Sequence, residues 1–444
     1  MLNNSISNNR KVTNHRRSFL KALSVIMVLV MVVTAMTACT TYDNFKNSFL
    51  GGNPEVKAPT IKIGVYEPLS GAYKQYGKDE AAGIELAHSL YPTVLGKEVE
   101  LIYADNRSNM YDADTALQEL MSQSPNFVLG SYGEVLSLVA ADYMVAYSTP
   151  AITITSTNPL ITVNNDFYFT ATFSTARQGA ALAEYAVNAL GKTSFATVKA
   201  VRDDSATAII QRFNNRIKKL TGGDESQKGN LVIDAEASDF SGCIEQLMNN
   251  QVETVLLAIP PAVAQTFMTQ CAEKGYLPQF LGTREWDSPD FEKYLQTSEY
   301  DLSVSYPSVQ ASDNTDTYQV FIDAYEKLNG KGSEPNGAVA AGFDSYRLAI
   351  KAIEDAYNNV KEADIEAMKA NSELDAKSRA EIQDYENTLE TGIPSGTQIR
   401  DALKAVSGFE GATGVLSYDG NAEVRKTVTI LHFFKGEKLA PYSI

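Results

Sequence analysis

The sequence predicts an α/β protein of two Rossmann-like lobes with parallel sheets, joined by a three-strand hinge. Short β-branched strands alternate with amphipathic helices from Ile61 onward, and this alternation is typical of parallel βαβ units. The alternation restarts after Phe173, so two sheets follow one another along the chain. The length supports two lobes, because 444 residues exceed what one ordinary core usually holds.

Residues 1–38 have the order of an export signal, in which arginines precede an apolar run and small residues precede a cysteine. The run from Ala22 to Met36 is shorter than the ~20 apolar residues of a usual membrane span. The segment Met36-Thr37-Ala38-Cys39 resembles the lipobox of bacterial lipoproteins, which implies lipidation of Cys39. An uncleaved signal anchor is the competing interpretation. Because Arg16 and Arg17 also resemble a twin-arginine signal, both export routes stay open.

Charge and composition restrict the partners. Cleavage before Cys39 would remove five basic and no acidic residues from a chain of net charge −16, leaving −21. A protein this acidic repels nucleic acid and anionic lipid headgroups. We therefore expect the lipid on Cys39 to hold the protein at the extracytoplasmic face of the cell membrane. Residues 39–59 are polar with Gly and Pro breakers, which predicts a flexible tether.

Cysteine and histidine usage argues against a metal centre. Beyond Cys39 only Cys243 and Cys271 remain, and either one bridge or two buried free thiols fits them. The three histidines are scattered and none lies in a ligand-like cluster, so we expect no metal and no cofactor.

The first lobe should open with alternating strands and helices. We expect strands over 61–66, 99–103, 127–130 and 151–155, and helices over 78–90, 112–122 and 136–147. The second series should have helices over 178–190, 206–220, 241–249 and 262–274, and strands over 194–201, 231–235, 254–259 and 279–282.

The C-terminal part should return to the first lobe. We expect helices over 321–328, 338–356 and 397–406, and a hairpin of strands 414–418 and 424–434 around Asp419-Gly420-Asn421. Between Lys361 and Thr391, nine acids and four bases with few large apolar residues predict a solvated helical insertion. The first lobe then comprises 60–173 and 303–424, and the second 174–302 and 425–444. Hinge strands are expected near 173–175, 302–306 and 424–427.

Ligands of open α/β sheets bind where strands end and helices begin, so the strand-end loops are the informative ones. Three of them are rich in hydroxyl groups, tyrosines and free N–H groups: Glu67 to Gly77, Gly130 to Glu134, and Thr153 to Pro159.

With these loops, the chain resembles the leucine/isoleucine/valine-binding family of solute receptors, which have the type I periplasmic-binding-protein fold. The segments IKIGVYEPLSG, GSYGE and TSTNP carry the resemblance, together with a second lobe that opens on a fresh βα series. It covers Thr60 to Ile444 except the acidic insertion. The family delivers amino acids and related small molecules to ABC importers, which implies a binding protein that partners an ABC permease.

The resemblance also implies residue roles. In the family, one lobe holds the ligand's carboxylate by loop N–H groups and hydroxyls, and the segment matching TSTNP holds its ammonium. By position, Thr155 and Thr157 would contact the ligand's ammonium group, and Ser131 would contact its carboxylate. Tyr76 would border the ligand, and Glu285 would be the acidic partner of the ammonium group.

The second lobe departs from the family at two loops. Arg202 to Ala206 lacks the tyrosine that the family often has there, and Arg284 stands beside Glu285, which favours an anionic group in the ligand. The candidate ligand-binding residues are therefore Ser70, Tyr76, Ser131, Tyr132, Gly133, Thr155, Ser156, Thr157, Asp203, Glu285 and Trp286.

Each candidate also has a structural interpretation. The threonines could cap a helix, the tyrosines could be surface residues, Glu285 could be a solvated loop charge, and Trp286 could be core packing. No nucleophile elbow, phosphate loop or zinc motif is present, so we assign no catalytic residue. We expect a monomeric binding protein that closes its lobes over the ligand. A ligand-sensing lipoprotein receptor is the alternative, and a secreted enzyme is the weaker one.

Overall fold

The computed structural model describes residues 59–309, 315–370 and 375–444. The export signal, Cys39 and nearly all of the predicted tether lie outside the described residues, so those predictions stay predictions. Within the described ranges, no helix is both long and apolar enough to cross a membrane.

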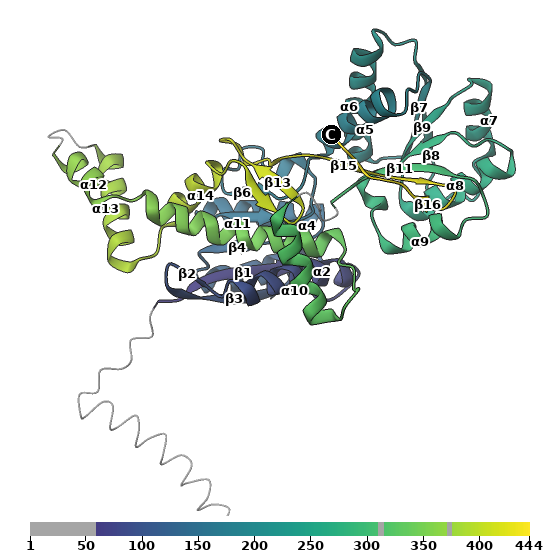
Figure 1. Cartoon of the computed structure of the whole chain (residues 1–444). Helices are drawn as coiled ribbons and strands as arrows, with labels where there is room; N and C mark the ends of the chain where they lie inside the picture. The colour runs from purple at the N-terminus through teal and green to yellow at the C-terminus, as the bar shows by residue number, and fades with distance from the viewer. Residues whose placement is uncertain (1–58, 310–314, 371–374) are drawn as a thin grey trace, which may run out of the picture. The chain divides into compact units, whose positions relative to one another are not determined.

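The first lobe is built on a six-stranded sheet (Figure 1) in the order β2-β3-β1-β4-β5-β6. All neighbours are parallel except β2 and β3. The strands are β1 (Ile61–Glu67), β2 (Thr93–Val94), β3 (Lys97–Asp105), β4 (Phe127–Leu129), β5 (Ala151–Thr153) and β6 (Tyr168–Thr170). The helices are α2 (Lys74–Leu90), α3 (Met110–Ser122), α4 (Glu134–Ala146), η1 (Pro159–Ile161), α10 (Asp316–Asn329), α11 (Gly337–Asn359) and α14 (Gly396–Lys404).

The second lobe has an eight-stranded sheet in the order β16-β15-β11-β10-β9-β7-β8, with β17 paired to β15. Strands β7 to β11 run parallel, and β15 runs antiparallel to β11. The strands are β7 (Phe195–Ala200), β8 (Gln227–Ile233), β9 (Thr254–Ala258), β10 (Gln279–Leu281), β11 (Ser303–Ser308), β15 (Thr429–Phe434), β16 (Glu437–Lys438) and β17 (Tyr442–Ser443). The helices are α5 (Thr175–Glu184), η2 (Tyr185–Ala189), α6 (Asp204–Thr221), α7 (Ser241–Asn249), α8 (Pro261–Glu273), η3 (Arg284–Trp286) and α9 (Pro289–Thr297). The predicted two-lobed α/β fold is confirmed.

Apolar residues bury both faces of the first sheet. Ile63 and Val65 of β1 point to a core shared with α2, α11 and α14, whereas Tyr66 points to a core shared with α3 and α4. This alternation follows from the two-residue period of a strand. Glu67, the last residue of β1, is also fully buried, which places a carboxyl group at the sheet's carboxyl edge.

Three chain crossings connect the lobes, and the structure moves two predicted boundaries. Strand β11 pairs with β10 and β15 in the second sheet, so the return to the first lobe follows Val309 rather than residue 302. The predicted strand 424–434 is divided, because β14 (Arg425–Lys426) pairs with β13 (Gly414–Ser417) while β15 joins the second sheet. Phe173, Val309 and Val428, one from each crossing, belong to the same buried cluster.

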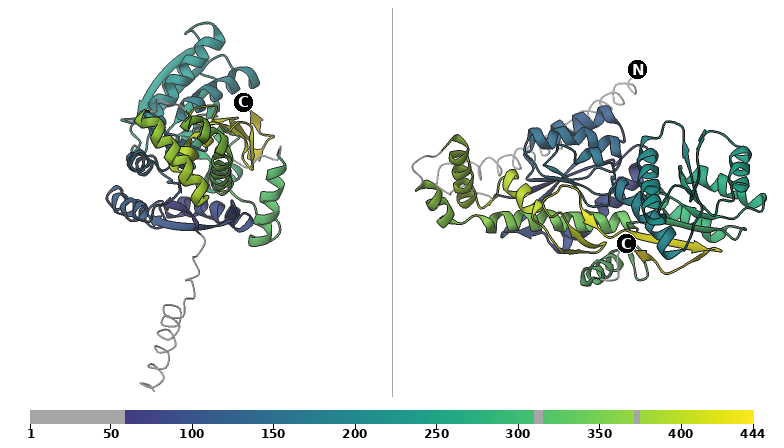
Figure 2. Two further views of the ribbon diagram at one scale, coloured as in Figure 1. Left: turned by 90° about the vertical axis from the view of Figure 1, so that its left-hand side faces the viewer. Right: turned by 90° about the horizontal axis from the view of Figure 1, so that it is seen from above.

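The predicted hairpin belongs to a three-stranded sheet of β12 (Phe409–Gly411), β13 and β14. The predicted insertion forms two helices, α12 (Glu362–Lys369) and α13 (Ala376–Thr391). Ile365 and Ile382 are buried in a small cluster of their own. Figure 2 shows the two helices at the end of α11 that faces away from the second lobe. They therefore contribute nothing to the sheet edges where a ligand would bind.

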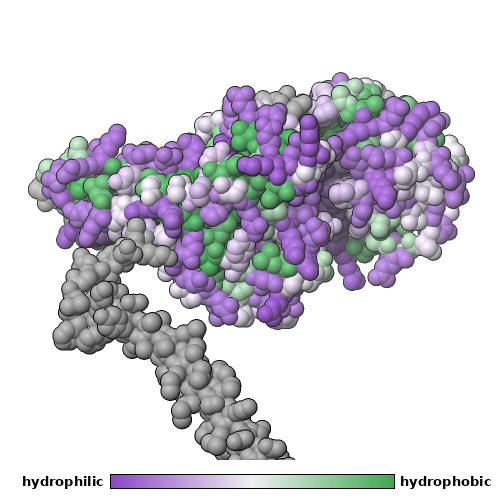
Figure 3. All heavy atoms as spheres, turned by 60° about the horizontal axis from the view of Figure 1, so that its bottom comes forward, coloured by the Kyte–Doolittle hydropathy of each residue, from purple (hydrophilic) through white to green (hydrophobic). Residues whose placement is uncertain are grey.

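Local sequence explains several helix starts and the state of the thiols. Asn109, Ser174, Asp203 and Ser395 each accept a backbone N–H at a helix start, which satisfies donors that the helix cannot pair. The thiols of Cys243 and Cys271 are both free. Figure 3 shows mainly hydrophilic residues on the visible face, in line with the high charge of the chain.

Candidate functional site

A cavity of about 890 Å³ is lined by residues from both lobes. Much of its lining comes from loops at the carboxyl ends of strands and from the helices that follow them, as expected for open α/β sheets. Eight of the eleven candidate residues line it: Tyr76, Tyr132, Gly133, Thr155, Ser156, Thr157, Asp203 and Glu285. The other three, Ser70, Ser131 and Trp286, do not.

The segment after β5 forms one wall. Thr155, Ser156 and Thr157 are all buried. The hydroxyl of Thr155 donates to Glu80 of α2, and the hydroxyl of Thr157 donates to Glu134 of α4 at 3.4 Å. Ser156 differs, because its buried hydroxyl has no hydrogen-bond partner within the described residues. The Ser156 hydroxyl is therefore available to a ligand.

Tyrosines form a second part of the first-lobe wall. The ring of Tyr76 stacks on that of Tyr132, with centroids 4.6 Å apart and planes 5° from parallel. Tyr73 packs against Tyr132 at 5.8 Å. Tyr73 and Tyr76 keep 43% and 44% of their surface exposed, so the cluster offers aromatic surface to the cavity.

Neither Ser70 nor Ser131 reaches the cavity, because other groups of the first lobe hold each of them. The hydroxyl of Ser70 donates to Asp105 at 2.7 Å. Ser131 is fully buried, accepts a hydrogen bond from Asn106 and donates to the carbonyl of Tyr132. The implied carboxylate contact of Ser131 therefore has no geometric support.

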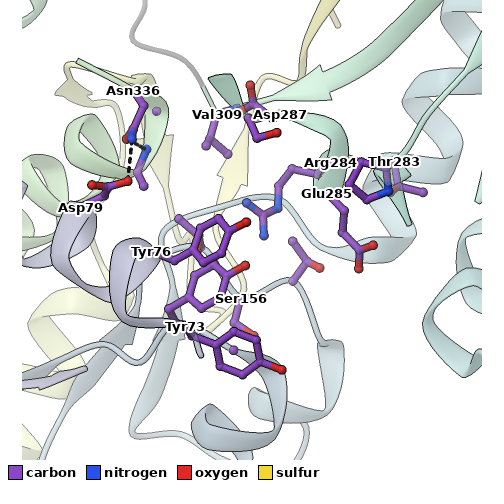
Figure 4. Close-up of a pocket in the computed structure, with 18 of the residues that line it drawn as sticks. Tyr73, Tyr76, Asp79, Ser156, Thr283, Arg284, Glu285, Asp287, Val309 and Asn336 are labelled. Carbon is purple, nitrogen blue, oxygen red and sulfur yellow. Dashed lines mark hydrogen bonds between the residues drawn. The ribbon is translucent and has the colours of Figure 1, made fainter. Parts of the chain in front are cut away.

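The second-lobe wall contributes an arginine and a glutamate to the cavity. Arg284 and Glu285 lie in the loop after β10, and Figure 4 shows the Arg284 guanidinium reaching toward the tyrosine cluster. The backbone N–H of Arg284 donates to Gln178 at 2.8 Å, which anchors the loop to α5. Among the described residues, no hydrogen bond or ion pair holds either charged side chain. The buried hydroxyl of Thr283 is also unpartnered there.

Trp286 packs inside the second lobe. It is fully buried, its Nε1 donates to the carbonyl of Ile259 at 2.9 Å, and its ring lies 4.8 Å from that of Phe291. Trp286 therefore anchors the segment that carries Arg284 to the core of the second lobe. The core-packing interpretation describes it correctly.

The cavity is acidic around one arginine. Burial raises the pKa of Glu134, and Arg284 opposes that shift. Glu285 is exposed at the cavity surface, but the surrounding protein still removes part of its solvent, which raises its pKa. The positive charge of Arg284 opposes this rise. Asp203 adds a third carboxyl close to both. The site therefore offers carboxylates to a positive group and one guanidinium to a negative group.

The arrangement can bind a small molecule. Within the described residues, no group of histidines, cysteines and carboxylates could hold a metal ion. The polar groups converge on a cavity of the size usual for small-molecule sites.

The family model described as periplasmic binding protein matches residues 60–424. The chain belongs to this family. No curated protein sequence matches it.

Solved structures agree with this periplasmic binding protein in fold. A leucine-binding protein, LivK, from Thermotoga maritima has 22% identity and a TM-score of 0.66, covering 86% of this chain and 98% of its own. LivJ from Streptococcus pneumoniae, in complex with isoleucine, has 20% identity and a TM-score of 0.65, covering 87% and 99%. A solute-binding protein from Rhodopseudomonas palustris in complex with p-hydroxybenzoic acid has 18% identity and a TM-score of 0.64, covering 87% and 97%.

Several lining residues were not among the candidates, including Tyr73, Asp79, Gln178, Thr283 and Asn336. Tyr73 could have been found, because it lies in the loop from Glu67 to Gly77 that the strand-end rule had already selected. Thr283 could also have been found, because it directly follows the strand expected over 279–282. Asp79 and Asn336 could not, because they meet across 257 residues, where the Asn336 amide donates to Asp79 at 2.7 Å (Figure 4).

Proposed function

We propose that this periplasmic binding protein is the substrate-binding lipoprotein of an ABC importer and takes an amino acid or similar small polar or anionic metabolite. The cavity of about 890 Å³ between strand-end loops of both lobes carries the proposal. Its opposed charges suit a zwitterion, with the ligand's acid on Arg284 and its ammonium near Glu134 and Glu285.

Closure follows from the three crossings. A ligand that contacts both walls stabilises the closed form by the contacts that only the closed form makes. Phe173, Val309 and Val428 lie in one buried cluster, so we expect the second lobe to move as a unit about this cluster.

Export, anchoring and partnership complete the proposal. The sequence before residue 40 supports a lipid-anchored protein at the extracytoplasmic face of the cell membrane. An ABC permease is the expected partner, since structural neighbours such as LivJ are described as substrate-binding proteins of transporters. We expect the binding protein itself to be a monomer.

The test is a ligand screen on the full-length chain in detergent. Amino acids, dicarboxylates, amides and small peptides are added, and the melting temperature is recorded, because a ligand that binds only the native state raises it. We expect amino acids with a second acidic group to give the largest shifts. Glu285→Gln should reduce the shift, whereas Glu299→Gln, an exposed glutamate outside the cavity, should not. Turnover of a compound that causes no shift would contradict a binding function.

A further inference from the structure

Two carboxyl groups lie buried together beneath the cavity. Glu67 ends β1 and Glu80 lies in α2, and both are fully buried. Each carboxyl group affects the pKa of the other, which places the two groups close together. Burying one carboxylate is costly, and burying two in contact is costlier still, so a proton between them is the stable arrangement.

Each carboxyl also holds one part of the cavity wall. The backbone N–H of Tyr132 donates to Oε2 of Glu67 at 2.8 Å, and the hydroxyl of Thr155 donates to Oε1 of Glu80. Oε1 of Glu67 and Oε2 of Glu80 are buried and have no hydrogen-bond partner among the described residues. These two oxygens are the ones left to share a proton.

The surrounding backbone is fitted to this pair. A Cβ on Gly130 would overlap the Glu67 carboxyl, and a Cβ on Gly342 of α11 would overlap the backbone of Glu80. Gly130 also has a φ of +105°, which favours glycine. The pair is therefore enclosed by the first lobe.

We propose that Glu67 and Glu80 share one proton and act as positioning residues, with Glu67 neutral beneath Tyr132 and Glu80 carrying the single negative charge beneath Thr155. This charge attracts the ammonium group of the ligand. The attraction of the ligand's ammonium group rests on the proposed function. The shared proton rests only on the two carboxyl groups.

The pKa directions agree with this geometry. Burial, and then the charge of Glu80, raise the pKa of Glu67 well above its usual value, so Glu67 keeps its proton at neutral pH. Burial raises the pKa of Glu80 to about 7, and the hydrogen bonds from Glu67 and Thr155 limit the rise.

Other titratable groups around the pair change its charge little. Asp79 raises the pKa of Glu80 and Arg284 lowers it. Tyr66, Tyr132 and Tyr168 also face the pair, and burial raises the pKa of each, so all three stay neutral. Glu80 is therefore the group that titrates near neutral pH.

Two pH effects follow. Because the folded pKa of Glu80 is raised, its contribution to stability is fully present below the unfolded value of about 4.5 and is lost as pH rises to about 7. Ligand binding should respond in the opposite direction, since the ammonium needs the ionised Glu80. Binding below pH 7 should therefore release a proton.

The first experiment needs no ligand. Infrared spectra of the full-length protein at pH 8 are compared for wild type, Glu67→Gln, and Glu85→Gln as a control on the exposed face of α2. We expect a protonated-carboxyl band in wild type and in the control, and its loss in Glu67→Gln, whose amide replaces the proton donor. Equal spectra in all three proteins would overturn the shared proton.

The second experiment uses L-glutamate and its deaminated analogue glutarate in calorimetry at pH 6 and pH 8. At pH 8, Glu80→Gln should weaken L-glutamate binding about tenfold and leave glutarate binding unchanged, while the control Glu85→Gln changes neither. Wild type should bind L-glutamate more weakly at pH 6 and release a proton there.

The two experiments separate the two proposals. Equal affinity of Glu80→Gln and wild type for L-glutamate would overturn the charge role. If neither compound binds any variant, these acids are not ligands, and the infrared comparison still decides the shared proton.

Discussion

The two lobes give the cavity different kinds of side chain. On the first-lobe wall, the hydroxyls of Thr155 and Thr157 and the ring of Tyr76 all have partners within their own lobe. On the second-lobe wall, the side chains of Arg284 and Glu285 have no hydrogen-bond partner among the described residues. A wall whose groups are already paired is held in place before a ligand arrives, whereas unpaired charges gain most from one.

This comparison separates paired groups from unpaired ones. The first lobe provides a prearranged surface of rings, hydroxyls and hydrogen-bonded carboxyls, and the second lobe provides the unpaired charged side chains of Arg284 and Glu285. If this is correct, substitutions in the second lobe should change affinity most, provided that the loop after β10 keeps its support.

The largest expected effect tests that support. Trp286→Ala removes a fully buried ring and should lower the free energy of unfolding by about 3–5 kcal/mol. Denaturant unfolding measures the change. Phe434→Ala, which removes a ring that is 43% exposed, is the control and should cost much less. Equal losses in both variants would show that Trp286 does not hold the loop.

The next effect tests the charge of the second lobe. Arg284→Met should reduce affinity for an anionic ligand roughly 30-fold, or about 2 kcal/mol, because a charge-assisted hydrogen bond is lost. Calorimetry measures it with the acid that gives the largest shift in the screen. Arg212→Met, on the exposed face of α6, should leave affinity unchanged. An unchanged affinity in Arg284→Met would place the acid group of the ligand elsewhere.

A smaller effect is expected in the first lobe. Thr157→Ala should weaken binding about fivefold, or about 1 kcal/mol, without lowering the melting temperature, because the 3.4 Å contact to Glu134 contributes little to folding. Thr266→Ala, on the exposed side of α8, is the matched control. A loss larger than that of Arg284→Met would reverse the proposed division between the lobes.

The smallest effect on the cavity is expected from Cys39→Ala. Ligand affinity should not change, since residues 60–444 contain the complete cavity. The variant should leave the membrane fraction, because its lipid attachment point is gone. Fractionation followed by immunodetection measures this. Retention of the variant in the membrane would favour an uncleaved signal anchor.

Much of the fold could be predicted because hydrophobic periodicity is a local property. Every strand expected between Ile61 and Gly282 lies in one of the two sheets, with ends shifted by a few residues. The predictions were wrong where strand pairing determines the sheet to which a segment belongs. β11 belongs to the second sheet because β10 and β15 pair with it, and no local pattern in Ser303–Ser308 specifies those neighbours.

The sequence by itself determined the two βα series and the loops at which a ligand could bind, because short-range patterns of apolar and turn residues encode these features. Only the tertiary structure decided which side chains of those loops face the cavity. Ser70 is hydrogen-bonded to Asp105, Ser131 to Asn106, and the Trp286 indole to the carbonyl of Ile259. The carboxyl group of Glu67 lies close to that of Glu80. The physical reason is that a buried polar group takes whichever partner the fold brings within reach, and most of these partners lie tens of residues away in the chain.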